Sequence, residues 1–276
     1  MVAAMAGFAL EDMVLKAVSQ QMPLGQVLVI FGLLGMACFG VMARRRGEPV
    51  FPAALFSRGM AVRSGFEVGG RLFYALAIAL TPLSVASAIL QATPLLVVGA
   101  AAVIFGEKVG WRRWVAVGIG FVGVLLILRP GLAGFDALSL LALAGMIGFA
   151  GRDLATRAAP PSLSNAQLGV AGFAMLSVSG VVIWSVSGGA VWPDPAGWAM
   201  LGAVTVLGVS AYAALTGAMR SGEVSVVTPF RYTRLVFALV LGVAVFGERP
   251  DALTLLGSAV IVAAGIYTLT QRPRIG

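Results

Sequence analysis

The sequence predicts an all-α integral membrane protein with ten transmembrane helices, arranged as two inverted five-helix repeats around a central cavity. Hydrophobic residues make up 59% of the 276 positions and charged residues only 11%, whereas a soluble domain carries roughly 25% charged residues. Apolar runs long enough to span a bilayer follow one another along the chain, and the first half of the sequence recurs in the second. A soluble globule could not hide this much apolar surface, so lipid must cover it.

Each apolar run is close to the roughly 20 residues that a membrane-spanning helix needs. The breaks between runs carry charged residues, proline or glycine, as at Arg129-Pro130-Gly131 and Pro160-Pro161. Two connections are so short, at Thr81-Pro82 and Ser221-Gly222-Glu223, that the helices beside them must form tight hairpins. The predicted spans are 3–20, 23–43, 59–80, 82–105, 111–128, 136–157, 164–186, 196–219, 224–246 and 251–270.

One constant spacing relates the two halves. Met5-Ala6-Gly7-Phe8-Ala9 recurs with small changes as Met146-Ile147-Gly148-Phe149-Ala150, 141 positions later. Shared hydrophobicity alone would not align acidic and amide residues, so we predict a repeat with units 1–130 and 136–276. The same spacing relates Asp12 to Asp153, Lys16 to Arg157, Gln26 to Gln167, Ser84 to Ser225, and Phe105-Gly106-Glu107 to Phe246-Gly247-Glu248.

Five spans is an odd number, so the second repeat enters the membrane inverted. With a cytoplasmic N-terminus, the inner connections hold most of the Lys and Arg, including Arg44-Arg45-Arg46, and the outer connections hold only Arg129 and Arg249. This bias predicts an inner-membrane, multi-pass chain with both termini cytoplasmic. The tryptophans fall near the predicted interfaces, with Trp192 outside. The net charge of +8 therefore belongs to the inner connections and does not indicate nucleic acid.

Other chemistries lack the residues that they need. The chain has no histidine and a single cysteine, Cys38, which leaves no histidine metal site and no intrachain disulfide. There is no glycine-rich phosphate loop and no Ser/His/Asp set. The N-terminus is apolar from Val2 and has no basic leader, so we interpret it as the first span and not as a signal peptide. We expect no enzyme, no cofactor and no metal.

The ten spans, the five-plus-five inverted repeat and the two Phe-Gly-Glu motifs resemble the drug/metabolite transporter superfamily, in its EamA-like ten-helix branch. The resemblance covers the whole chain and rests on Gly7-Phe8-Ala9 with Asp12 and Lys16, on their equivalents from Gly148 to Arg157, and on the two Phe-Gly-Glu motifs. It implies a basket of helices around a central cavity, with the fifth and tenth helices peripheral. Within the superfamily, the sequence is most similar in character to bacterial aromatic amino acid exporters.

Ionisable residues inside a span are functional candidates, because burying a charge in lipid is expensive. Asp12 and Lys16 lie one turn apart on the first span, as do Asp153 and Arg157 on the sixth. Each pair either neutralises itself near the interface or lines a polar cavity or gate.

The third and ninth spans carry further charges. On the third span, Arg63, Glu67 and Arg71 follow one another at intervals of four. They either form a ladder of ion pairs that satisfies itself, or they act in transport. In the second case Arg71 would bind a carboxylate on the substrate and Glu67 would bind a proton. On the ninth span, Arg231 and Arg234 can snorkel to the interface, and Tyr232 points off that side toward the cavity.

Polar and aromatic residues at middle depth predict a pocket for an amphipathic solute. For any one of them, packing or an interhelical hydrogen bond is the alternative. The candidate substrate-binding residues are Tyr74, Gln91, Tyr212, Thr216, Tyr232, Phe8 and Phe149.

Two prolines are candidate hinges. Pro94 lies near the middle of the fourth span and Pro229 lies inside the ninth, six positions before the equivalent of Pro94. Proline removes a helix hydrogen bond and kinks the helix, so each either lets half of its helix swing or fixes a bend. Gly99 and Gly242 would leave room for the swing.

The sequence therefore predicts a secondary transporter that works by alternating access. Amino acid export, of aromatic amino acids above all, is the favoured activity. Uptake of a cofactor-like or nucleotide-sugar-like solute, or a channel or scaffold role, is the alternative. The expected partners are a small-molecule substrate and the lipid bilayer, without nucleic acid; a monomer and coupling to H+ are expectations that the residues leave open.

Overall fold

The computed structural model describes residues 1–104, 110–129, 136–156, 162–221 and 228–270, and these form helices without any strand. All ten predicted spans are represented, with ends within a few residues of the predicted ones. The elements are α1 (Val2–Ser19), α2 (Leu24–Arg45), η1 (Ala53–Phe56), α3 (Arg58–Leu80), α4 (Leu83–Leu90), α5 (Thr93–Ile104), α6 (Trp111–Leu128), α7 (Ser139–Thr156), α8 (Asn165–Ser187), α9 (Pro195–Ser221), η2 (Thr228–Tyr232), α11 (Thr233–Phe246) and α12 (Ala252–Thr270).

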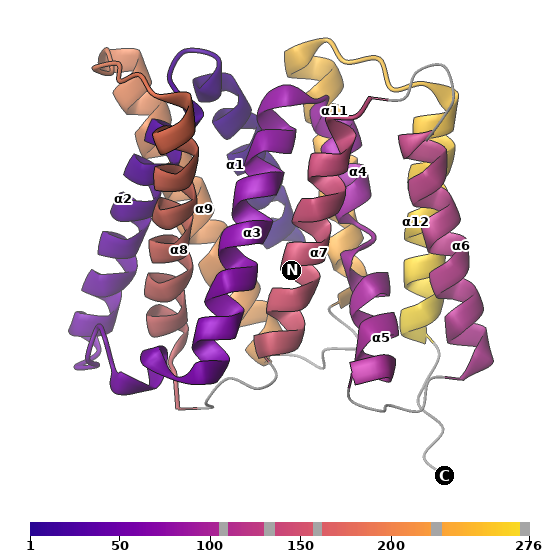
Figure 1. Ribbon diagram of the computed structural model, residues 1–276, viewed down its shortest axis with the longest axis horizontal. Helices are drawn as coiled ribbons and strands as arrows, with labels where there is room; N and C mark the ends of the chain where they lie inside the picture. The colour runs from indigo at the N-terminus through magenta and orange to yellow at the C-terminus, as the bar shows by residue number, and fades with distance from the viewer. Residues whose placement is uncertain (105–109, 130–135, 157–161, 222–227, 271–276) are drawn as a thin grey trace.

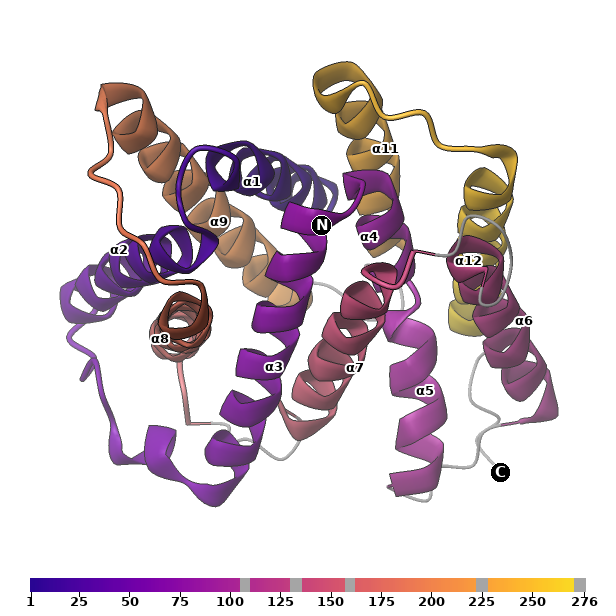
Figure 2. The same ribbon diagram turned by 45° about the horizontal axis from the view of Figure 1, so that its top comes forward.

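The helices stand side by side as one bundle (Figures 1 and 2). α6 and α12 pack against each other at one edge of it, α2 packs against α8 at the other, and the remaining helices lie between. The connections after α1, α3, α8 and α11 lie at the end drawn uppermost in Figure 1, which we call the upper end; the connection after α2 lies at the lower end. The peripheral position of the fifth and tenth spans agrees with the resemblance.

The helix ends follow from local sequence. Ser164 and Gln167 form a capping box at the start of α8, and the Ser57 side chain accepts a hydrogen bond from the backbone amide of Met60 at the start of α3. Gly247 ends α11 in the left-handed conformation, with φ +63°, which glycine adopts without a Cβ penalty.

The fourth predicted span is two helices. α4 ends at Leu90 and α5 begins at Thr93, so the prediction of one helix over 82–105 is wrong at its middle. The cause is Pro94, which has no N–H to give to the carbonyl of Leu90. The hydroxyl of Thr93 donates to that carbonyl instead, as side chains do at broken membrane helices.

The ninth predicted span begins in the described chain with η2, which contains Pro229, and continues as α11. Pro94 thus lies just after a break between two α-helices, and Pro229 lies in the 3₁₀-helix that precedes α11. The first predicted residues of the ninth span, 224–227, lie outside the described residues.

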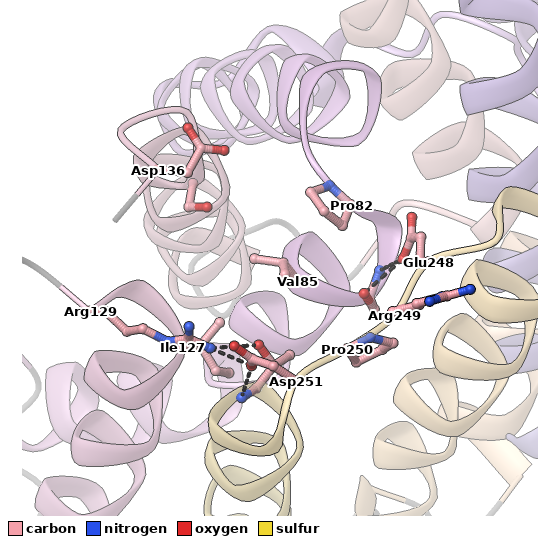
Figure 3. Close-up of a pocket in the computed structure, with 12 residues that line it drawn as sticks. Pro82, Val85, Ile127, Arg129, Asp136, Glu248, Arg249, Pro250 and Asp251 are labelled. Carbon is pink, nitrogen blue, oxygen red and sulfur yellow. Dashed lines mark hydrogen bonds and ion pairs between the residues drawn. The ribbon is translucent and has the colours of Figure 1, made fainter. Parts of the chain in front are cut away.

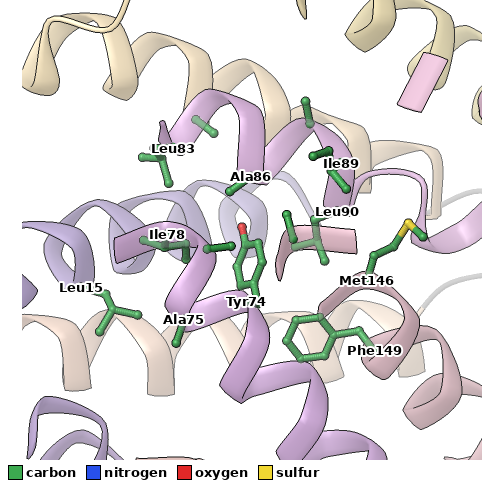
Figure 4. Close-up of a cluster of buried hydrophobic side chains, with 14 of the residues drawn as sticks. Leu15, Tyr74, Ala75, Ile78, Leu83, Ala86, Ile89, Leu90, Met146 and Phe149 are labelled. Atoms are coloured by element: carbon green, nitrogen blue, oxygen red, sulfur yellow. The ribbon is translucent and has the colours of Figure 1, made fainter. Parts of the chain in front are cut away.

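Small residues bring the central helices together. A Cβ added to Gly148 on α7 would lie 2.4 Å from the backbone nitrogen of Gly70 on α3, and one added to Gly25 on α2 would lie 2.4 Å from that of Trp184 on α8. Such close approaches are typical of membrane bundles, in which van der Waals packing drives association. Around Tyr74, α1, α3, α4 and α7 share a buried apolar cluster (Figure 4).

Among the described residues, three helices are long and apolar enough to cross a membrane by themselves. They are α2, α8 and residues Pro195–Leu215 of α9. α1 and α3 instead carry charged residues near their middle, and α7 carries Arg152 and Asp153 toward its end. Those charges meet inside the bundle and define the candidate site.

Candidate functional site

A network of arginine and carboxylate side chains joins α1, α3, α7, η2 and α11. Its acidic members are Glu11, Asp12, Glu67 and Asp153, and its basic members are Arg63, Arg71, Arg152, Arg231 and Arg234. Within the described chain, the formal charges sum to one excess positive charge. Such groups persist inside a membrane protein only when they face one another, water or a ligand.

Asp12 on α1 is held by residues from two other helices. Its Oδ2 accepts a hydrogen bond of 2.6 Å from Arg234 Nη2 on α11 and one of 3.2 Å from the Tyr74 hydroxyl on α3. The Tyr74 hydroxyl also lies 3.4 Å from Ser87 Oγ on α4. Asp12 therefore ties the first helix to the ninth span.

Glu67 on α3 is surrounded by three guanidinium groups. Arg63 Nη2, Arg71 Nε and Arg152 Nη1 lie 3.4, 3.3 and 3.4 Å from its oxygens. The first two contacts confirm the predicted ladder at intervals of four. The third comes from α7, so the ladder is not self-contained and reaches into the other half of the chain.

Asp153 on α7 is also bound by arginine. Arg152 Nη2 lies 2.8 Å from Asp153 Oδ1, and Arg231 Nη2 on η2 lies 3.9 Å from Oδ2. Arg231 and Arg234 thus pair with carboxylates of α7 and α1, and the expectation that they snorkel to the interface is wrong.

Aromatic rings lie beside these cations. The guanidinium groups of Arg71 and Arg152 lie 5.9 and 4.9 Å from the ring centre of Phe149, and that of Arg234 lies 5.2 Å from Phe8. These distances suit cation–π attraction. Phe8 and Phe149, which hold equivalent positions in the two halves, therefore both flank the network.

The Asp12–Lys16 pair predicted on α1 does not form. Lys16 Nζ instead binds Glu248 Oε1 at 3.2 Å and the carbonyl of Thr81 at 2.6 Å. The two side chains share a face as predicted, but each finds a better partner on another helix. Asp153 can be placed, whereas its predicted partner Arg157 lies outside the described residues.

The Lys16–Glu248 contact forms a lock at the upper end. Glu248, which follows α11, accepts hydrogen bonds from the backbone amides of Leu83 and Ser84 and from the Ser84 hydroxyl, at 2.6, 3.0 and 2.7 Å. It therefore caps the N-terminus of α4, where a carboxylate is favourable. Burial alone would raise the pKa of Glu248, but these hydrogen bonds and the Lys16 ammonium outweigh it and lower the pKa.

Beside this lock lies an open pocket of about 290 Å³ (Figure 3). Its walls include Glu248, Arg129, Asp136 and Asp251. Arg129 forms an ion pair with Asp251 and thereby links α6 to α12, and this hydrogen bond lowers the pKa of Asp251 to about 2. The pocket is at the upper end, away from the buried network.

Two of the predicted substrate residues border the network. Tyr74 belongs to it, and Tyr212 interacts electrostatically with Arg63, Glu67 and Arg152. The Tyr212 ring packs against Phe39 and Phe173 at centroid distances of 5.4 and 6.3 Å. The Gln91 amide donates to the backbone carbonyl of Arg231.

Tyr232 points away from the other predicted substrate residues. A Cβ on Gly265 of α12 would lie 1.7 Å from its hydroxyl. Its prediction as a cavity residue is therefore wrong in direction. Thr216 lies on α9, and its side chain is outside the described part of the chain.

The sequence interpretation missed Glu11 and Arg152 as site residues, although both lie in the network. They are 141 positions apart and therefore equivalent in the proposed repeat. The signal that identifies them is this spacing, which relates an acidic residue in one unit to a basic residue in the other. In the described chain, no group of three or more His, Cys, Asp or Glu residues is arranged to hold a metal ion.

The helical bundle with buried charges defines a class, that of multi-pass membrane transporters. The family model described as EamA-like transporter family matches residues 1–129 and 135–270. The chain belongs to the EamA-like transporter family, as the resemblance predicted. The family is one of multi-pass inner-membrane transporters.

Relatives within this family carry different substrates in their names. An "S-adenosylmethionine uptake transporter" of Rickettsia prowazekii is 25% identical over 71% of this chain and 65% of its own length. The "Riboflavin transporter" of Vibrio cholerae is 28% identical over 67% and 61%. The chain thus spans just under two thirds of the length of these relatives. The "Pseudopaline exporter CntI" of Pseudomonas aeruginosa is 25% identical over 94% of this chain and 90% of its own.

One solved crystal structure superposes with a TM-score of 0.63 at 21% identity, covering 97% of both chains. At this identity the likeness concerns the fold alone.

Proposed function

We propose that the chain is a secondary transporter that moves a small amphipathic metabolite by alternating access, with amino acid export, in particular of aromatic amino acids, as the favoured activity. The observation that carries the proposal is the buried charge network. Asp12 is paired with Arg234 and Glu67 with Arg152, and both pairs join residues 1–130 to residues 136–276. Charges buried in a membrane bundle mark substrate and ion pathways.

Alternating access follows most simply from an inverted repeat, because exchanging the conformations of the two units exchanges inward and outward cavities. The helix contacts support two units, 1–130 and 136–276. α1 packs against α9 and α11, while α7 packs against α3, α4 and α5, which are the equivalent helices of the other unit. The equivalent pairs α2–α8 and α6–α12 pack against each other.

The direction of insertion is part of the proposal. Both termini face the cytoplasm, and the upper end of the bundle, with the Lys16–Glu248 lock, faces outward. In the described conformation this lock would hold the outer mouth closed. Substrate binds at the network, near Tyr74, Phe149 and Arg71, and the breaks at Pro94 and Pro229 allow parts of the fourth and ninth spans to move.

A second activity, uptake of a cofactor-like solute, is supported by the printed names of two relatives, which concern S-adenosylmethionine and riboflavin. A channel would need an open polar path along several helices, whereas the buried charges in the described residues pair with one another.

The test is solute flux in proteoliposomes that contain the purified chain. A panel of labelled aromatic amino acids, S-adenosylmethionine and riboflavin is offered with and without a proton gradient. We expect saturable flux of one class, with counterflow when the same unlabelled solute is trapped inside. Flux that never saturates would indicate a channel, and no flux of any solute above protein-free liposomes would contradict the proposal.

A further inference from the structure

The network contains one carboxylate that is poorly satisfied. The Glu11 side chain is only 4% exposed, and its ion-pair partner, Arg71 Nη1, lies 3.8 Å from Glu11 Oε1. In the described chain, no side chain or backbone group donates a hydrogen bond to this carboxylate. An ionised carboxylate buried without hydrogen bonds is unfavourable by several kcal/mol. A cationic donor would therefore stabilise Glu11.

Arg71 lies between two carboxylates. Its Nε points to Glu67 at 3.3 Å and its Nη1 faces Glu11 at 3.8 Å. Glu67 is also contacted by Arg63 and Arg152 at 3.4 Å, so it keeps cationic partners when Arg71 turns to a ligand. The ion pair of Glu11 in the described residues is the long contact with Arg71.

We propose that Glu11 and Arg71 bind the ammonium and carboxylate groups of a zwitterionic α-amino acid, a substrate class that rests on the proposed transport function. Charge-assisted hydrogen bonds are typically about 2.7–2.9 Å long, so the 3.8 Å contact between Glu11 and Arg71 is a weak pair. A zwitterion that enters between them gives each group a hydrogen-bonded partner of opposite charge. The exchange involves no net charge, which suits a low-dielectric site.

An apolar wall lies next to this pair. The Phe149 ring is 5.9 Å from the Arg71 guanidinium and meets the Tyr74 ring edge to face at 5.9 Å. α3 and α7 touch at Gly70, where an added Cβ would lie 2.8 Å from Phe149 Cδ1. These rings favour an aromatic side chain on the amino acid, because edge-to-face and offset stacking add to burial.

The two charges give the subsite a direction. Glu11 and Arg71 carry opposite charges and lie 3.8 Å apart. A substrate with one positive and one negative group therefore binds between them in one orientation, whereas a singly charged solute satisfies only one of the two side chains.

Three aromatic probes separate the two charges. L-phenylalanine carries both, phenethylamine carries only the ammonium, and 3-phenylpropionate carries only the carboxylate. Binding to the purified full-length chain is measured by titration calorimetry, and transport by counterflow. We expect wild type to bind L-phenylalanine at least about tenfold more tightly than either analogue, since each charged hydrogen bond contributes about 1.5–3 kcal/mol.

Two isosteric variants assign the groups. Glu11→Gln should weaken L-phenylalanine about 10- to 100-fold and leave 3-phenylpropionate unchanged. Arg71→Gln should weaken L-phenylalanine and 3-phenylpropionate and leave phenethylamine unchanged. Asp136→Asn, which removes an exposed carboxylate before α7, is the matched control and should bind all three as wild type does.

The proposal is overturned if Glu11→Gln binds L-phenylalanine as wild type does. It is also overturned if wild type shows no preference for the zwitterion, an outcome that needs no variant to fold. Saturable flux of another solute in the same proteoliposomes would then leave the transport function standing and remove only this substrate class. An absence of flux for every solute would remove the transport function itself.

Discussion

Replacing Glu248 by glutamine should destabilise the chain more than any other single exchange of a carboxylate at the ends of the bundle. Both oxygens of Glu248 are used, Oε1 by the Leu83 amide and Lys16 and Oε2 by Ser84. A glutamine side chain has one oxygen and one NH₂ group. In either orientation its NH₂ group, which cannot accept, faces one of these two pairs of donors. At least two hydrogen bonds to a charged acceptor are therefore lost.

The magnitude follows from those contacts. Hydrogen bonds to charged groups contribute about 1.5–3 kcal/mol each, and water at the neighbouring pocket recovers part of the loss. We expect a cost of about 2 to 4 kcal/mol, or roughly 5 to 15 °C in Tm on the scale of soluble chains of this length. Thermal unfolding in detergent, followed by tryptophan fluorescence, measures it.

The pH dependence has a defined sign. Because the folded pKa of Glu248 is lowered, its stabilising contribution is complete above the unfolded value of about 4.3 and is lost as the pH falls through the folded pKa. The difference in Tm between wild type and Glu248→Gln should therefore be constant from about pH 5 to 8 and shrink in stronger acid.

A double-mutant cycle with Lys16→Met separates the ion pair from the capping of α4. Ser84→Ala, which removes one hydroxyl donor to the carboxylate, is the smaller matched change and should cost about 1 to 2 kcal/mol, roughly half as much. An unchanged Tm in Glu248→Gln, or a difference that grows in acid, would refute the argument that this carboxylate is held ionised by the α4 terminus.

Three further outcomes are expected. Asp251→Asn should cost less than about 1 kcal/mol, because this side chain is 50% exposed and asparagine also caps helices well; a loss as large as that of Glu248→Gln would contradict the role assigned to burial. In a Cys38→Ser background, a cysteine replacing Trp192, which is 86% exposed, should react with an impermeant maleimide added outside intact cells, and labelling only after permeabilisation would reverse the proposed orientation. Spin-label distances across the two mouths should lose their substrate-dependent change in Pro94→Ala and Pro229→Ala, whereas distributions equal to wild type would leave these prolines as fixed bends.

The helices could be predicted from the sequence because each depends on a local run of apolar residues. Pro94 also indicated an irregularity in the fourth span. The position of the break, however, depends on which side chain donates a hydrogen bond to the Leu90 carbonyl. Thr93 does so, and only the folded chain selects it.

The site was predictable in its residue types and not in its pairings. Spacing of four pointed Asp12 to Lys16, yet Asp12 pairs with Arg234, 222 positions away, and Lys16 with Glu248, 232 positions away. Such partners depend on how α1 packs against the ninth span. Glu67 has partners of both kinds. Its partners on α3 could be predicted from their spacing, whereas Arg152 on α7 depends on how the helices pack.

The ladder on α3 has a consequence for biosynthesis. Arg63, Glu67 and Arg71 lie inside a span, and a translocon scale assigns each such residue a penalty of about 2.5–3.5 kcal/mol near the centre of a helix. α3 is therefore a poor substrate for insertion as a single helix. Its partner Arg152 lies on α7, which leaves the ribosome dozens of residues later.

The nascent first half thus waits in the bilayer with charges whose partners are not yet made. Asp12 waits even longer, because Arg234 is supplied by α11 near the end of the chain. Neither half is therefore expected to be stable in the membrane without the other. Residues 1–130 expressed alone should be recognised by the membrane quality-control proteases of the cell and degraded. We therefore expect the protein to become stable in its membrane only after translation is complete, and not as each helix inserts.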